Sequence, residues 1–184
     1  KDLGDMHTKH GHGEGSSPVL YGDSLIVNWD HEGQSFLVAF DKRSGKELWK
    51  VDRVEGTSWT TPIIVEHRGN PQIIISGSKR VQSYDLATGR VLWECGGLSV
   101  ENVTASPVAG HGMVYAGSSY DKQALLAINL TGAKGDITGT QQVVWSRTRR
   151  TPYVPSLLLY GNSLYFHSHF QGILNRVNAQ TGED

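Results

Sequence analysis

One motif recurs along this chain and constrains the fold more strongly than any other feature of the sequence. It reads Ala-Phe-Asp-Lys-Arg-Ser-Gly-Lys-Glu-Leu-Trp over residues 39–49 and Ser-Tyr-Asp-Leu-Ala-Thr-Gly-Arg-Val-Leu-Trp over residues 83–93. A looser copy over residues 127–145 carries an insertion before its Trp, and a last copy occupies residues 176–184. Because a fixed period is the signature of repeat architectures, the chain is predicted to consist of similar units placed side by side.

A second marker recurs in the same register. Upstream of each copy, a small or hydroxyl residue precedes a proline and an apolar run. The prolines are 44, 45 and 48 positions apart, and the Asp or Asn of the first motif recurs after 44, 44 and 49 positions. Two separate markers that keep one period indicate a real repeat. The two sets are Pro18, Pro62, Pro107 and Pro155, and Asp41, Asp85, Asn129 and Asn178.

Each unit has the composition of short β-strands separated by turns. Apolar runs such as residues 25–27, 36–40 and 113–115 alternate with turns that contain Gly, Asn or Asp, such as residues 21–24. Gly beside Asp or Asn supplies the positive φ angles that tight hairpins need. Val, Ile, Leu and Tyr between such turns are typical of strands, and no window shows a capped helical period.

The period and the strand count together predict the architecture. Four antiparallel strands in about 40–50 residues are expected of one propeller blade. The chain is therefore predicted to be an all-β protein, a β-propeller segment with about four four-stranded antiparallel blades. The units are expected to cover residues 5–50, 51–95, 96–147 and 148–184.

Physical chemistry gives each part of the recurring motif a role. The Asp accepts hydrogen bonds from backbone N–H groups two and three residues further on, and the Gly takes the left-handed conformation. The Trp is large enough to fill the wedge between neighbouring blades. The predicted structural residues are Asp41, Asp85, Gly45, Gly89, Trp49, Trp93 and Trp145.

The pattern Ala-x-Asp-x-x-Thr-Gly-x-x-x-Trp resembles the tryptophan-docking motif of the pyrroloquinoline-quinone-like (PQQ-like) propellers. This family includes quinoprotein alcohol dehydrogenases and the propeller lipoprotein of the bacterial outer-membrane assembly machine. The resemblance implies that the three Trp residues dock between blades, near the small residues Ala39, Ser83 and Ala127. The third unit departs from the pattern through Asn129 and the insertion over residues 133–140. The tryptophan–aspartate repeat is the alternative fold, but its Gly-His and Trp-Asp signature does not recur here.

The number of units raises the question of ring closure. Propellers of this family usually have about seven or eight blades, so the chain is expected to be part of such a ring. An alternative is a homodimer of two half-rings, since exposed blade edges favour association. A ring that closes by itself is the remaining possibility.

Composition excludes several classes of partner. The net charge of −1 gives no electrostatic basis for binding nucleic acid or an acidic membrane surface. No apolar run approaches the length of a transmembrane helix, so membrane insertion is not expected, and the chain shows no signal peptide. Cys95 is the one cysteine, so no disulfide forms within the chain. A periplasmic or otherwise extracytoplasmic location is implied by the family resemblance alone.

Binding residues are expected on the loops that lead into the first strand of each blade, because loops on a rigid scaffold often carry function. Trp59 lies outside the docking register and is a candidate aromatic platform. Arg147, Arg149, Arg150 and Tyr153 form a basic segment with an aromatic end, which suits a carboxylate or phosphate group. The competing interpretations are a solvated loop for the arginines and a cap over the central funnel for Trp59.

Histidines form two candidate metal-binding pairs. The side chains of His167 and His169 project from one side of a strand end, where Asp30 or His31 from another blade would complete a site. His10 and His12 form the other pair, without a carboxylate or cysteine at a suitable spacing. A polar loop that enters the first inner strand is the simpler interpretation of His10 and His12, and satisfied polar residues are the simpler interpretation of His167 and His169, so no metal is expected.

These observations favour a non-catalytic propeller that binds a protein, a peptide or a cell-envelope ligand on its loop face, with no cofactor. The alternative is part of a PQQ-dependent quinoprotein dehydrogenase that requires calcium, for which Trp59 is the one candidate stacking residue. The adjacent cysteines and the calcium-binding carboxylate set of that class are not found in the sequence. A third hypothesis is a lyase or hydrolase that uses His167 and His169.

Overall fold

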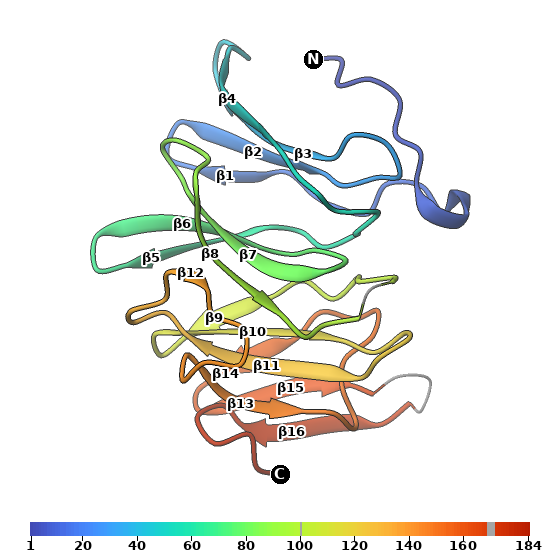
Figure 1. The fold of residues 1–184 in the computed structure, drawn as a ribbon, viewed down its shortest axis with the longest axis vertical. Coiled ribbons are helices and arrows are strands. Elements are labelled where there is room, and N and C mark those ends of the chain that lie inside the picture. Colours follow the sequence, from blue (N-terminus) through green and yellow to red (C-terminus); the bar gives the residue numbers. More distant parts are fainter. Residues whose placement is uncertain (100, 169–171) are drawn as a thin grey trace.

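A computed structural model describes residues 1–99, 101–168 and 172–184. Four antiparallel sheets follow one another along the chain and stack in that order, with the two termini at opposite ends of the stack (Figure 1). Apart from one 3-10 turn, η1 (Lys9–Gly11), the regular structure of the described residues is β-strand. The predicted all-β fold is confirmed, and the sheets are successive blades of a partial β-propeller.

Blades 1 to 3 contain their strands in chain order. Blade 1 consists of β1 (Val19–Tyr21), β2 (Ser24–Trp29), β3 (Phe36–Asp41) and β4 (Glu47–Asp52). Blade 2 consists of β5 (Ile63–His67), β6 (Asn70–Ser76), β7 (Arg80–Asp85) and β8 (Val91–Gly96). Blade 3 consists of β9 (Val108–Gly110), β10 (Met113–Ser118), β11 (Ala124–Asn129) and β13 (Val143–Arg147).

Blade 4 has three strands among the described residues. They are β14 (Leu158–Tyr160), β15 (Ser163–His167) and β16 (Leu174–Asn178). The first strands of neighbouring blades contact one another, since β1 touches β5 and β9 touches β14. These first strands therefore line the inner side of the stack, and the loops that lead into them lie close together.

The core lies between the blades, where the facing sides of successive sheets pack together. Along β3, alternate side chains point to opposite faces, as strand geometry requires. Leu37 and Ala39 pack against blade 2, whereas Phe36 and Phe40 face away from it and are covered in part by Leu3. Each such Leu, Ile or Phe stabilises the fold by about 1.5–3 kcal/mol when it leaves water.

A ladder of hydroxyl groups joins the inner loops of all four blades. The backbone N–H of Ser17 donates to Thr61 Oγ1 at 3.0 Å, and that of Thr61 donates to Ser106 Oγ at 2.9 Å. The N–H of Ser106 in turn donates to Ser156 Oγ at 3.1 Å. The small hydroxyl residue of the second marker therefore has a structural role, because it satisfies a backbone donor of the preceding blade.

The hydroxyl ladder shows that the alignment of the fourth unit with the other three differs from the predicted one. Pro18, Pro62 and Pro107 each directly precede the first strand of a blade, but in blade 4 that position belongs to Leu157. The interpretation of Pro155 as the fourth marker was therefore wrong by two residues. The Ser-Leu pair that follows Pro155 carries the hydroxyl group and the strand entry instead.

Two of the three predicted docking tryptophans contact the motif turn of the next blade. Trp49 Nε1 donates to the carbonyl of Leu86, and Trp145 Nε1 donates to the carbonyl of Ala179, both at 3.0 Å. The indole rings lie flat against Gly89 and Gly182, where an added Cβ would come within 2.6 and 2.7 Å of ring carbons. Glycine at this position thus makes room for the ring.

The motif turns have the hydrogen bonds that the sequence predicts. Ser44 and Thr88 donate their backbone N–H groups to Asp41 Oδ1 at 2.7 Å and Asp85 Oδ1 at 2.9 Å. Gly45 and Gly89 have φ angles of 68° and 71°. These contacts fix the turn that holds each docking surface in place.

Trp93 is arranged differently. It is 1% exposed, and its Nε1 donates to Gln72 Oε1 of its own blade at 3.1 Å. In blade 3 the Gly follows Asn129 by three positions, not four, so Ala133 stands where the other turns have glycine. Trp93 packs into the core between blades 2 and 3, and Ala133 packs against the same cluster.

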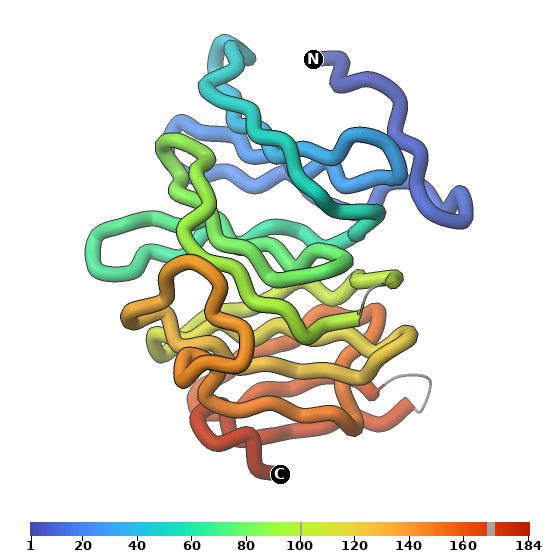
Figure 2. Tube along the Cα trace, viewed as in Figure 1, coloured from blue at the N-terminus to red at the C-terminus, as the bar shows by residue number. Residues whose placement is uncertain are grey.

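The insertion of blade 3 covers the outer edge of blade 2. Residues of β12 (Gly135–Asp136) pair in parallel with β8, and Ile137 donates its N–H to the carbonyl of Glu94 at 2.9 Å. Figure 2 shows this loop lying across the outer strand of the neighbouring blade. Ile137 is buried in the same cluster as Trp93, so the insertion supplies the cover that the altered turn does not provide.

Candidate functional site

The inner loops of the four blades enclose a pocket of about 480 Å³, called here the loop pocket. One lining residue from each blade stands four positions before the first residue of that blade's first strand. The equivalent residues thus differ in size and chemistry while sharing one place in the repeat. They are Gly15, Trp59, Thr104 and Val154, and His12, Asn102 and Tyr153 complete the described lining.

Hydrogen bonds between the inner loops fix the walls of the loop pocket. Trp59 donates its N–H to the carbonyl of Val103 at 3.0 Å, and Thr104 Oγ1 donates to the carbonyl of Tyr153 at 2.6 Å. Ser58 and Val103 also form a parallel bridge. The pocket is therefore part of the rigid scaffold.

Trp59 is held as a fixed platform. Its Nε1 donates to the carbonyl of Gly13 at 2.8 Å, and its ring packs against Gly15, where an added Cβ would come within 2.7 Å. The ring of His12 lies 6.1 Å from the indole, centroid to centroid. The indole pays little conformational entropy on contact with a ligand, because its orientation is already set.

Tyr153 provides a second aromatic wall. Its ring stacks on Tyr120 with a centroid distance of 5.9 Å and an interplanar angle of 22°. Burial raises the pKa of the Tyr153 hydroxyl, the neighbouring Tyr120 raises it further, and the Asn102 amide acts in the opposite direction. Tyr153 is therefore a neutral phenol at physiological pH, suited to packing and hydrogen bonding.

Asn102 brings a buried amide to the loop pocket. It is 7% exposed and has a positive φ of 49°, a conformation that Asn tolerates better than most residues. Its Oδ1 has no hydrogen-bond partner among the described residues. A buried acceptor of this kind is unfavourable until a donor reaches it, so the pocket favours a ligand that brings an N–H or O–H group.

The structure separates the predicted basic segment into two parts. Arg147 Nη1 lies 2.8 Å from Asp184 Oδ1 and also donates to the carbonyl of Gly182, while Arg150 lies 4.0 Å from the same carboxylate. Arg149 is exposed. None of the three arginines is among the described residues that line the loop pocket, so the structure does not unite them with Tyr153 in one anion site.

The predicted metal pairs are also placed by the structure. His167 is exposed, and His169 lies outside the described residues. Both proposed partners are engaged elsewhere: Asp30 pairs with Arg53, and His31 Nδ1 accepts the backbone N–H of His7 at 3.2 Å. No group of three potential metal ligands occurs within residues 1–99, 101–168 and 172–184.

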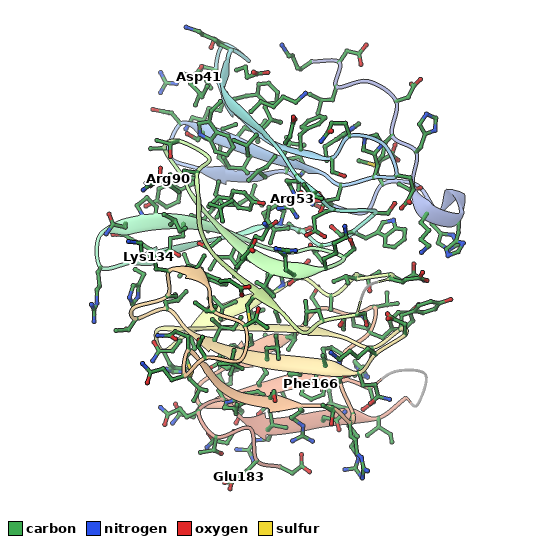
Figure 3. The ribbon with its side chains drawn as sticks, viewed as in Figure 1. Asp41, Arg53, Arg90, Lys134, Phe166 and Glu183 are labelled. Carbon is green, nitrogen blue, oxygen red and sulfur yellow. The ribbon has the colours of Figure 1, made fainter. Side chains whose placement is uncertain are left out.

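A buried ion pair behind the loop face was not found by sequence reasoning. Arg53 donates from Nε to Asp30 Oδ1 at 2.7 Å and from Nη2 to Asp30 Oδ2 at 3.1 Å, and both side chains are fully buried. Arg53 Nη1 also reaches Gln82 and Tyr84 of blade 2. Figure 3 shows Arg53 between the first and second blades. The pair therefore joins two blades.

The repeat offers one signal for this ion pair. Arg53 stands four positions after Trp49, and Arg149 stands four positions after Trp145. In blade 3, however, the position equivalent to Asp30 is Ser119, so the exposed Arg149 lacks the acidic partner. An arginine at this position is buried only where the same blade also supplies the carboxylate.

Within the described residues, no helix has the length and apolar character needed to cross a membrane.

The sequence matches the family described as outer membrane protein assembly factor BamB over residues 6–184, which is nearly the whole chain. A comparison with curated proteins gives no match.

Solved structures share the fold at low sequence identity. BamB from Moraxella catarrhalis is similar with a TM-score of 0.61 and 19% identity, covering 90% of this chain and 49% of that chain. Quinohemoprotein alcohol dehydrogenase from Comamonas testosteroni gives 0.62 and 14%, covering 93% and 34%. Quinohemoprotein alcohol dehydrogenase ADHIIG from Pseudomonas putida HK5 gives 0.60 and 17%, covering 97% and 34%. The chain thus spans half the length of these proteins or less.

Proposed function

The chain belongs to the PQQ-like propeller family of the outer membrane protein assembly factor BamB, and on that basis we propose that it is a non-catalytic module that binds a polypeptide segment in its loop pocket. One observation carries this proposal. Four blades place four different residues at one repeat position, and these residues surround a single pocket. The scaffold positions are equivalent, whereas the side chains that a ligand would meet are not.

The chemistry of the loop pocket suits an extended peptide. Trp59 and Tyr153 supply rigid aromatic walls for an apolar side chain, a common feature of protein interfaces. Asn102 Oδ1 is a buried acceptor for a backbone N–H, which every residue except proline provides. A peptide strand thus brings both an apolar group and a donor within a few ångströms of each other.

The Tyr153 hydroxyl of the loop pocket is suited to hydrogen bonding with a ligand. Burial raises its pKa, so its proton is held more firmly at neutral pH.

The family assignment supports a place for this module in outer membrane protein assembly, in the periplasm or another extracytoplasmic compartment. The ligand would then be a protein or peptide. Segments of outer membrane barrels alternate apolar and polar residues over about ten positions, so peptides of that pattern are the natural first probe.

The direct test is the affinity of such a peptide, measured by fluorescence anisotropy for the unchanged chain and for Trp59→Ala. We expect at least a tenfold loss of affinity, since aromatic anchors in interfaces contribute about 2 kcal/mol or more. Tyr160→Ser is the matched control, because Tyr160 is 77% exposed on β14 and is not among the described lining residues. Equal affinity for all three proteins would contradict the proposal.

A quinoprotein dehydrogenase function is the second candidate, favoured by one observation. Trp59 presents a fixed indole in a pocket at the loop face, as a stacked planar cofactor would require. Titration with PQQ, with and without calcium, separates the two functions. Saturable, calcium-dependent binding that is lost in Trp59→Ala would favour the dehydrogenase.

A further inference from the structure

A second cavity of about 200 Å³ lies between the N-terminal segment and blade 1, and is called here the strap cavity. Its walls come from residues 3–18, from β2 and from the inner loop of blade 2, and it shares Gly15 and Trp59 with the loop pocket. A volume of about 200 Å³ is well above the space that a single water molecule needs. That is enough for one long side chain or a small organic molecule.

Asn28 gives the strap cavity an acceptor with a fixed orientation. The residue is 2% exposed, and its Nδ2 donates to Asp30 Oδ2 at 3.2 Å. Because an ionised carboxylate only accepts hydrogen bonds, the amide nitrogen must face Asp30 and the amide oxygen must face the other way. Within the described part of the chain, that oxygen has no hydrogen-bond partner. A buried acceptor in this state favours a ligand that brings a donor.

A second polar atom of the strap cavity is also buried without a hydrogen-bond partner in the described part of the chain. Ser16 Oγ is buried, and it too has no partner among the described residues. The two atoms come from different segments, since Ser16 belongs to the N-terminal segment and Asn28 belongs to β2. A ligand with several donors on one atom would satisfy both.

The charge of the strap cavity is negative. Glu14 is the charged side chain among its described lining residues, and it is exposed at the edge. Behind Asn28, the carboxylate of Asp30 is already neutralised by Arg53. The cavity thus offers one unneutralised carboxylate and no cation among the lining residues that the structure describes.

The apolar walls favour the same class of ligand. Trp29 and Trp59 both line the strap cavity, together with Val27 and Met6. Indole rings attract an organic cation through the negative face of the π system, and Trp is the strongest of the aromatic side chains in this respect. Aromatic walls, neutral acceptors and one carboxylate together select an alkylammonium group over an anion or a neutral hydrocarbon.

We propose that the strap cavity binds a primary alkylammonium group, with its nitrogen donating to Asn28 Oδ1 and Ser16 Oγ and its methylene chain lying between Trp29 and Trp59. Glu14 supplies the long-range attraction. Two sources carry this chemistry: a free amine and the side chain of a lysine in a polypeptide.

The test uses n-butylammonium chloride as the probe and n-butanol as its neutral counterpart of similar size. Binding is followed by Trp fluorescence and by isothermal titration calorimetry at low ionic strength. We expect n-butylammonium to bind at least tenfold more tightly than n-butanol, because a hydrogen bond from a charged donor is stronger than one from a hydroxyl. Equal affinity of the two, or no saturation by n-butylammonium, would overturn the proposal.

Two substitutions separate the parts of the site. Glu14→Gln keeps the shape of an exposed side chain and is expected to weaken n-butylammonium binding by about twofold to fivefold, in line with an exposed charge pair. Glu47→Gln, on the exposed outer strand β4, is the matched control and should leave the affinity unchanged. If Glu14→Gln and Glu47→Gln have the same effect, the assignment of Glu14 is wrong.

Asn28→Leu removes the orphan acceptor and is expected to lower the affinity for n-butylammonium by at least tenfold. It also removes the hydrogen bond to Asp30, so its fold is checked by circular dichroism. Trp29→Leu serves as the second variant if Asn28→Leu does not fold, because Trp29 is only half-buried and contributes through its ring. Unchanged affinity in the folded variant would contradict the geometry proposed here.

The two sources are distinguished with short peptides. Acetyl-Gly-Lys-Gly-amide is compared with acetyl-Gly-Met-Gly-amide, which has a side chain of similar length without the charge. Binding of the lysine peptide alone identifies a polypeptide ligand, whereas binding of n-butylammonium without either peptide identifies a free amine. Both results support the alkylammonium site, and binding of both peptides equally contradicts it.

Discussion

The two ends of the blades use the same repeat in different ways. At the motif turns, the residues themselves recur, as in Asp41 with Gly45 and Asp85 with Gly89. At the pocket-lining position of the inner loops, only the position recurs, and the residue changes from Gly15 to Trp59 and on to Thr104. The turns that receive Trp49 and Trp145 therefore build matching contacts between blades, while the pocket-lining positions build a single pocket with unlike walls. The difference indicates that stability depends on the recurring residues and binding on the residues that depart from the repeat.

Trp93 shows how narrowly the recurring contacts are specified. The motif turn of blade 3 is one residue shorter between its Asn and its Gly. Gly132 therefore stands one position too early, and Ala133 stands at the position that is glycine in the other turns. The Trp93 ring is then fully buried, and the insertion that contains Ile137 packs over it. The spacing of Asp and Gly, and not the presence of Trp alone, decides how the ring contacts the next blade.

Trp93→Ala is expected to have the largest effect on the turn side of this comparison. Removal of a ring that is 1% exposed leaves a cavity between blades 2 and 3 and should lower the free energy of unfolding by about 4–5 kcal/mol. Trp49→Ala, whose ring is half-buried, should cost about 2–3 kcal/mol. Urea denaturation measures both, and an equal loss for the two would show that the insertion adds nothing to the packing of Trp93.

Arg53→Met tests a loop-side residue whose role is structural. It leaves the fully buried carboxylate of Asp30 without its cation and should lower the free energy of unfolding by about 3 kcal/mol or more. Arg149→Met changes the equivalent residue of blade 3, which is exposed, and should fall within about 0.5 kcal/mol of the unchanged protein. Thermal unfolding followed by circular dichroism compares them. Similar losses of stability in the two variants would contradict the claim that Arg53 stabilises the fold through its buried ion pair with Asp30.

Gly89→Ala should cost about 2 kcal/mol, because the new Cβ meets the Trp49 ring and the φ of 71° is unfavourable for alanine. Gly132→Ala has a similar φ of 79° but only Gln142 nearby, so about 1 kcal/mol is expected. The difference between the two variants isolates the ring contact. If Gly132→Ala were the more damaging change, the turn of blade 3 would be a docking surface after all.

Thr138→Ala is expected to have a small effect, about 1 kcal/mol. The Thr138 hydroxyl accepts the N–H of Gly96 at 2.8 Å and so helps to hold the insertion on the outer edge of blade 2. Hydrogen exchange at the amide of Gly96 provides the measurement, and faster exchange is expected in the variant. Unchanged exchange would mean that the insertion contributes no protection at this edge.

The fold followed from the sequence because the Asp or Asn of the motif recurs over four units and the proline marker keeps the same period over three of them. The places where single units depart from the repeat could not be predicted from the sequence. The shift from Pro155 to Leu157 depends on which hydroxyl reaches the neighbouring blade, and the strand over residues 135–136 pairs with β8, about forty positions earlier in the chain. Neither partner can be identified from local propensity.

The candidate site was predicted in part. Trp59 is a candidate because it lies outside the docking register, and Tyr153 is a candidate because it ends the basic segment; both line the loop pocket. Arg147 was expected beside Tyr153, but it is held by the last motif turn through Gly182 and Asp184. Asn102 carried no sequence signal, since only the packed structure shows that its amide oxygen is buried without a partner.

The most direct test of this account is to measure affinity and stability together on Trp59→Thr, which gives blade 2 the residue that blade 3 has at the same position. We expect peptide affinity to fall at least tenfold while the free energy of unfolding changes by no more than about 2 kcal/mol. Unchanged peptide affinity in a folded Trp59→Thr protein would contradict the claim that the departures from the repeat build the binding site.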